Sequence, residues 1–117
     1  MANNQPFVLK NAVEIGKNID VTLGSISSST VDLSTGNYFN DTLTANTTYI
    51  FSNPGDVQAF QMEITGNGST ITWPSSVDWS GGTEPADPAS GQKDIYSFIT
   101  PDDGTTYYGF KSATNVS

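Results

Sequence analysis

The side chains best suited to chemistry in this sequence are carboxylates, because the chain contains neither His nor Cys. That composition removes the usual general base near neutral pH, the thiol nucleophiles and the commonest metal ligands. Asp78, Glu84 and Asp87 lie near Trp79 in one segment. Two carboxylates held about 5 to 9.5 Å apart in a cleft can hydrolyse a glycosidic bond. No spacing here fixes such a pair, so we expect these acids to solvate a surface loop and expect no enzymatic activity.

A second acidic group, Asp102 and Asp103 followed by Gly104, is similar to part of a calcium-binding loop. The alternating Asp or Asn positions and the distal Glu of an EF-hand are missing. A tight turn, in which Asp makes local hydrogen bonds and Gly takes a positive φ, explains the same residues. We therefore predict no metal site and no cofactor.

Two tryptophans stand six residues apart at the start of the first acidic segment and have different expected roles. Trp73 shares a strand face with Ile71, which predicts a place in the core. Trp79 shares a face with Val77 and precedes two glycines. It is expected to close the end of the core, with a carbohydrate-stacking platform or a subunit contact as alternatives.

Other aromatic residues are candidates for contacts with a neighbouring subunit or ligand. Tyr107 and Tyr108 point to opposite faces of their predicted strand, so only one of them can be in the core. Phe7 lies in the polar segment that begins the chain. The candidate contact residues are therefore Trp79, Tyr107, Tyr108 and Phe7.

Length and charge restrict the function further. The chain has 117 residues, which fits one domain, and a net charge of −8. Such a field repels phosphate backbones and anionic membranes, so we expect no nucleic-acid partner. No segment approaches the ~20 apolar residues of a membrane span, so we expect no membrane insertion. The N-terminus carries no secretion-signal pattern.

The elements that must position these residues are short strands. Alternation predicts strands over 18–23, where Ile19, Val21 and Leu23 share a face, over 29–34 and, most regularly, over 57–65. A strand over 47–52 ends at Asn-Pro-Gly, where Gly55 is expected to take a positive φ. Hairpin turns are predicted at 66–69, leading to a partner strand over 70–73, and at 101–104 between strands over 93–100 and 105–112.

The number and spacing of these strands predict one all-β domain, an antiparallel β-sandwich of jelly-roll-like form, over residues 19–117. Residues 1–18 are expected to be an N-terminal arm or an edge strand. The segment 80–92 is the longest without an apolar period, and loops of that length are often functional. No internal repeat is evident.

Four segments carry a resemblance to a known module: VDLSTGNYF (31–39), TYIFSNPG (48–55), ITWPSSVDWSGGTEP (71–85) and DIYSFITPDDGTTYYGF (94–110). In this order and spacing they resemble a β-rich module of tail-fibre and other virion structural proteins of bacteriophages, cyanophages in particular. The resemblance implies a virion component without catalysis.

The chain lacks the shaft repeats and coiled coil of a fibre, so we expect a stand-alone protein of the virion. The first hypothesis is a capsid decoration (cement) protein that binds the major capsid protein or another virion scaffold, assembled as a homo-oligomer and most simply a trimer. The alternative is a carbohydrate-binding receptor module of a tail or head fibre, with Trp79 and the loop 80–92 holding a host glycan.

Overall fold

The longest strands form where apolar and polar residues alternate most regularly. The computed structural model describes residues 21–117, and within them β6 (Gln58–Thr65) and β9 (Lys93–Thr100) are the longest strands. Phe60, Met62 and Ile64 of β6 are buried and Gln61 is exposed, as the alternation predicts. The other strands of this part of the chain are β1 (Ser25–Ser27), β2 (Thr30–Asp32), β3 (Tyr38–Thr42), β4 (Thr47–Thr48), β5 (Ile50–Ser52), β7 (Ile71–Thr72), β8 (Val77–Trp79) and β10 (Tyr107–Ala113).

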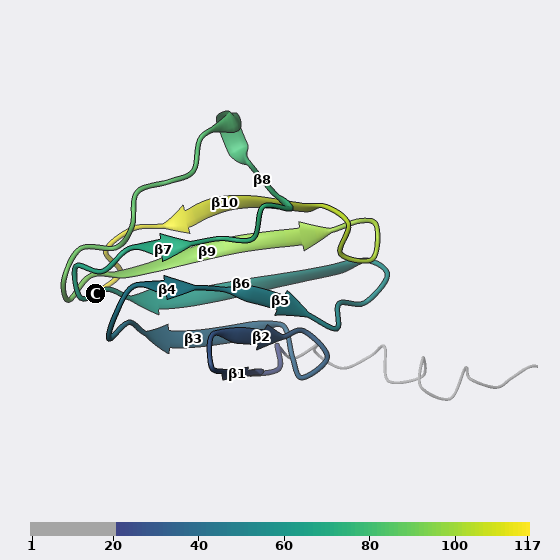
Figure 1. Ribbon diagram of the computed structural model, residues 1–117, viewed down its shortest axis with the longest axis horizontal. Helices are drawn as coiled ribbons and strands as arrows, with labels where there is room; N and C mark the ends of the chain where they lie inside the picture. The colour runs from purple at the N-terminus through teal and green to yellow at the C-terminus, as the bar shows by residue number, and fades with distance from the viewer. Residues whose placement is uncertain (1–20) are drawn as a thin grey trace, which may run out of the picture.

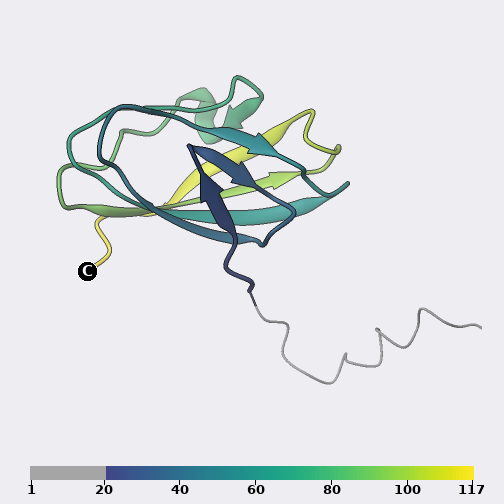
Figure 2. The same cartoon turned by 60° about the horizontal axis from the view of Figure 1, so that its bottom comes forward.

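These strands build two layers that face each other across one core (Figures 1 and 2). The first layer is a five-stranded sheet of order β3-β6-β9-β10-β8. The second consists of a three-stranded sheet, β1-β2-β5, and the two-stranded pair β4-β7. The predicted all-β sandwich is confirmed over the described residues. The predicted arm or edge strand, residues 1–18, lies outside them.

The pairing differs from the purely antiparallel one that we expected. Four of the seven strand pairings among the described residues are parallel: β2 with β5, β3 with β6, β4 with β7 and β8 with β10. Parallel partners need a crossover between them. Here β2, β3 and β4 form one turn of a coil around the core, and β5, β6 and β7 form the next turn beside it. The jelly-roll-like arrangement is therefore not confirmed.

The predicted hairpin at 66–69 is wrong for the same reason. The turn exists, and Gly68 has a φ of 90°. The chain then leaves the five-stranded sheet and enters the other layer, where β7 pairs in parallel with β4. Ile71 and Trp73 are buried as predicted, but they face the core from the opposite side.

The second predicted hairpin is confirmed, because β9 and β10 pair antiparallel across the turn at 101–104. Asp103 and Gly104 take φ values of 58° and 81°, as such a turn requires. After β5 the positive φ falls on Asn53, at 54°, and not on Gly55. Asn tolerates this left-handed conformation better than most residues.

The predicted half-buried strand over 18–23 is only partly described, since Ile19 lies outside the described residues. Val21 and Leu23 are each 62% exposed, so the expected burial of these two residues is wrong. Leu23 forms an isolated parallel bridge with Tyr38 at the edge of β3. Paired residues point to the same face of a sheet. Leu23 therefore shares the outer face of the sheet with Tyr38, while the next residue of β3, Phe39, points into the core.

Trp73 lies in the core, 6% exposed, as predicted. Ring centroids of neighbouring aromatic residues lie 4.9 to 6.4 Å from its own, and they belong to Tyr49, Phe51, Trp79, Tyr96 and Phe98. Its indole Nε1 is buried with no hydrogen-bond partner among the described residues. Its contribution to stability is therefore packing.

We expect Trp73→Ala to lower the free energy of unfolding by about 3 to 5 kcal/mol, because it opens a cavity among these rings. Trp79→Ala should cost less, since Trp79 is only partly buried. Trp73→Phe should retain most of the stability, because no hydrogen bond is lost. Chemical denaturation of the three variants measures this, and equal losses for Trp73→Ala and Trp79→Ala would contradict it.

Candidate functional site

The predicted platform residue Trp79 packs on the core. Its ring centroid lies 5.5 Å from that of Trp73, 5.6 Å from Phe98 and 6.4 Å from Tyr96. Gly109 of β10 makes room for it, because a Cβ there would lie 3.1 Å from Trp79 Cζ3 and 2.9 Å from the Phe98 ring. Trp79 thus packs on the core from β8, an edge strand of the five-stranded sheet, which fits the first of its expected roles.

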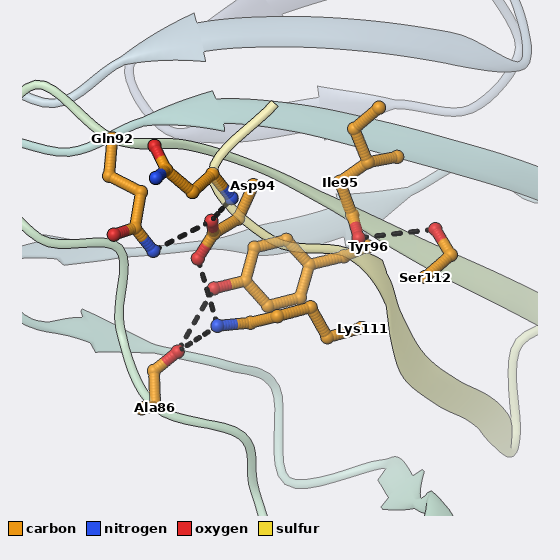
Figure 3. Close-up of polar contacts among 8 residues, drawn as sticks. Ala86, Gln92, Asp94, Ile95, Tyr96, Lys111 and Ser112 are labelled. Carbon is orange, nitrogen blue, oxygen red and sulfur yellow. Dashed lines mark hydrogen bonds and ion pairs between the residues drawn. The ribbon is translucent and has the colours of Figure 1, made fainter. Parts of the chain in front are cut away.

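The loop 80–92 starts with a short 3-10 turn, η2 (Ser80–Gly82), and is then held against the sheet. The carbonyl oxygen of Ala86 accepts hydrogen bonds from Lys111 Nζ at 2.7 Å and from the Tyr96 hydroxyl at 3.3 Å (Figure 3). Pro88 is fully buried. Gly66 lies so close to it that a Cβ there would come within 2.3 Å of the Pro88 oxygen. The loop is therefore anchored at its middle.

The centre of this anchor is Asp94, a carboxylate that is fully buried. Its Oδ2 lies 2.8 Å from Lys111 Nζ, and its Oδ1 accepts hydrogen bonds from Gln92 Nε2 at 2.9 Å and from the backbone N–H of Asn115 at 2.8 Å (Figure 3). Burial raises the pKa of Asp94, but the bonds from Lys111, Asn115 and Gln92 outweigh it and hold the pKa below its ordinary value. Lys111 Nζ also lies 5.5 Å from the centroid of the Tyr96 ring. One ion pair thus joins the loop, β9, β10 and the C-terminal segment.

The acidic residues that were considered for a catalytic or metal site in the sequence have other surroundings in the structure. Asp78 and Glu84 are exposed, as expected for solvated acids. Asp102 Oδ1 accepts a bond from the backbone N–H of Thr106 at 2.8 Å, which is the turn interaction that we predicted. This bond holds the pKa of Asp102 below its ordinary value. Within residues 21–117 no group of three acidic side chains is arranged to hold a metal ion.

The two adjacent tyrosines separate as the alternation requires. Tyr107 is 3% exposed and belongs to the core, so we remove it from the candidate contact residues. Tyr108 is 52% exposed on the outer face of the five-stranded sheet. Phe7 lies outside the described residues.

Tyr108 is part of a larger apolar surface. It pairs with Ile99, which in turn pairs with Ala59, so the three form one row across β10, β9 and β6. Phe110, two residues after Tyr108, lies on the same face. Ile99 is 41% and Phe110 51% exposed. We call the surface formed by Val21, Ala59, Ile99, Tyr108 and Phe110 the outer patch.

A shallow groove of about 350 Å³ runs along the outer patch. The small side chain of Ala59 leaves space there between larger neighbours. None of the residues that line the groove is charged: Val21, Asn37, Ala59, Phe60, Gln61, Ser97, Phe98, Ile99 and Phe110. An apolar surface with exposed aromatic residues and no charge is typical of the centre of a protein interface.

Polar side chains border the patch on the same face. Gln61 Nε2 donates to Ser97 Oγ at 3.1 Å, and Ser97 Oγ donates to Ser112 Oγ at 3.0 Å. Toward the other end of β6 and β9, Lys93 Nζ forms an ion pair with Glu63 Oε2 at 3.4 Å. The Tyr38 hydroxyl donates to Glu63 at 2.8 Å. Burial is the main cause that raises the pKa of Tyr38 to about 12, and this hydrogen bond is the second cause. The face is thus apolar at one end and polar at the other.

Ile99 and Phe110 were missed in the sequence, although a signal was present. Residues two positions apart in a strand point to the same face, so Phe110 could have been grouped with Tyr108. In the same way, the alternation along β9 indicates that Ile99 points outward. That β9 and β10 lie side by side follows from their hairpin. The register that brings Ala59 of β6 into the same row required the structure.

In residues 21–117 no helix has the length and apolar character that a membrane crossing needs. No protein-family model, no curated protein and no solved structure matches this chain. The geometry of the outer patch and the sequence resemblance are therefore the basis for a functional proposal.

Tyr107→Ala and Tyr108→Ala form a matched pair that tests the assignment of the two faces. We expect Tyr107→Ala to lower the free energy of unfolding by about 3 to 5 kcal/mol, and Tyr108→Ala by less than about 1 kcal/mol. Urea denaturation monitored by fluorescence measures both. A larger loss for Tyr108→Ala would contradict the assignment.

The buried Asp94 should make stability depend on acid pH. Since its pKa is lower in the folded than in the unfolded chain, its stabilising contribution is present above the ordinary value of 3.8 and is lost as pH falls through the folded pKa. We expect Asp94→Asn to destabilise the protein at neutral pH and to flatten the acid limb of its stability curve. Asp78→Asn, at an exposed position, controls for the loss of one negative charge. Equal curves for both variants would contradict the role of Asp94.

Proposed function

We propose that this chain is a non-enzymatic structural protein of a bacteriophage virion, and that it decorates the capsid by binding the major capsid protein. The observation that carries the proposal is the outer patch, which presents Ile99, Tyr108 and Phe110 on a sheet whose other face packs on the core. Exposed apolar surfaces of this kind mark contacts with other proteins. The resemblance of residues 31–110 to virion modules supports the same class of function.

The energetics of the outer patch suit a structural assembly. A half-exposed aromatic side chain that becomes buried contributes about 2 kcal/mol before the costs of association are counted. One patch is therefore a modest contact. Copies joined in an oligomer, for which we propose a trimer, would bind a capsid through several contacts at once, and multivalency would raise the overall affinity.

The charge of the chain fits a position on the outside of the particle. A net charge of −8 disfavours contact with packaged nucleic acid. The groove itself carries no charged side chain, so a partner needs apolar surface and not a complementary charge. Both features favour the surface of a protein shell.

Binding to separated phage components tests the proposal. Labelled full-length protein is incubated with heads and with tails of a bacteriophage that encodes the chain, and bound copies are counted. We expect many copies on heads, and binding at least about tenfold weaker for Phe110→Asp, since a loss of 1.4 kcal/mol corresponds to tenfold. Thr72→Asp, at an exposed position of β7 in the other layer, is the matched control and should bind normally.

Three results would argue against decoration. Binding only to tails would place the protein in an appendage, and binding to neither component would remove the virion role. Binding to a host glycan, lost in Trp79→Ala but retained in Phe110→Asp, would favour the carbohydrate-binding alternative.

A further inference from the structure

The described part of the chain begins at the groove. Val21, its first residue, lines the groove together with Ala59, Ile99 and Phe110. Twenty residues precede it in the sequence. Whatever these residues bind, they start from the edge of the outer patch.

The sequence before Val21 has the pattern of a strand with one apolar face. From residue 7 to residue 23 the odd positions are apolar except for Asn11 and Lys17, and the even positions are mostly polar or small. This period of two over so long a stretch predicts an extended segment that buries one side. The apolar odd positions are Phe7, Leu9, Val13, Ile15, Ile19, Val21 and Leu23.

The last residues of this segment already continue the sheet. The carbonyl oxygen of Thr22 accepts bonds from the backbone N–H groups of Asn37 and Tyr38 at 2.9 and 3.1 Å, and Gly24 N–H donates to Tyr38 O at 2.8 Å. Through its bridge to Tyr38, Leu23 lies on the outer face, where the patch is. The apolar side of the segment therefore matches the apolar face of the sheet.

The segment is long enough to reach a second copy. Leu23 pairs in parallel with Tyr38, the first residue of β3, so the described chain joins the five-stranded sheet at its β3 edge. The stretch from Phe7 to Val21 spans up to about 45 to 50 Å when extended. That reach is sufficient to cross a neighbouring copy.

We propose that residues 7–19 of one copy dock on the outer patch of a second copy, with Leu9, Val13 and their apolar neighbours at odd positions facing Ile99, Tyr108 and Phe110. The inference rests on the proposed role of the outer patch as a protein contact, and it makes a second copy, in place of the capsid protein, the occupant of the patch. The oligomer then meets the capsid through surfaces that the segment leaves free, and Phe110→Asp weakens binding to heads because the copies separate and multivalency is lost. Exchange of such segments among copies generates a closed oligomer without any further interface. It also covers the apolar residues that the isolated copy exposes.

Engineered cysteines test the contact directly, because the natural chain has none. Full-length Leu9→Cys and Ile99→Cys variants are mixed and oxidised, and the linked peptides are identified by mass spectrometry. We expect a disulfide that joins the segment of one copy to the patch of the other, at twice the chain mass of 12.4 kDa. Leu9→Cys mixed with Thr72→Cys, which lies in the other layer, should not link.

Substitutions at neighbouring odd and even positions of the segment provide a second test. We expect Val13→Asp to reduce the mass measured by sedimentation from that of an oligomer to that of one chain, whereas Ala12→Asp, one residue away, should leave it unchanged. Equal masses for the two variants, a full-length chain of one-chain mass at every concentration, or a link found only within one copy of a Leu9→Cys/Ile99→Cys chain would each overturn the inference.

These outcomes are separable from those for the proposed function. If the link fails to form while Phe110→Asp still weakens binding to heads, the inference is wrong and the function stands. If the link forms and no phage component is bound, the function is wrong and the inference stands.

Discussion

The two layers of this protein depend on one cluster of aromatic rings. Phe51 of β5 reaches across the core, and its ring centroid lies 5.0 Å from Tyr107, 5.1 Å from Phe60 and 5.3 Å from Phe98 of the opposite sheet. Trp73 fills the space beside it. The chain contains no cysteine, so this packing stabilises the fold in place of the disulfides that many small domains have. Edge-to-face contacts favour particular ring orientations, which fixes how the layers lie on each other.

Hydrogen bonds and an ion pair beside the core hold segments that do not pack against the aromatic cluster. Asp94 and Lys111 join the loop 80–92 to the C-terminal segment, and the Tyr49 hydroxyl donates to Asp41 at 2.6 Å beside β3. Buried ion pairs contribute little net stability, because removing charges from water opposes their attraction. The value of the Asp94 pair is geometric, because its carboxylate accepts donors from three parts of the chain: Gln92, Lys111 and Asn115. The loop 80–92, in which only Pro88 is buried, is thereby held in one position.

The outer patch and the core lie on opposite faces of the same five-stranded sheet. Side chains alternate between the two faces of a strand, so the register that places Phe60 and Phe98 inward also places Ala59 and Ile99 outward. One end of that outer face is polar and hydrogen-bonded, as expected for contact with water, and the other end is apolar. This asymmetry supports our proposal that the protein is one part of an assembly.

The sequence by itself determined several local features: the two longest strands, the buried side of β6, the burial of Trp73, the hairpin between β9 and β10, and the division between Tyr107 and Tyr108. Each of these follows from a period of two or from turn residues only a few positions apart. Only the tertiary structure decided that the turn at 66–69 leads to the other layer, that four pairings are parallel, and that Ala59 joins Ile99 and Tyr108 in one row. Alternation specifies which side of a strand is apolar but not which strand lies beside it. The choice of neighbour is made when distant segments compete to bury the same core, and no short stretch of sequence contains that information.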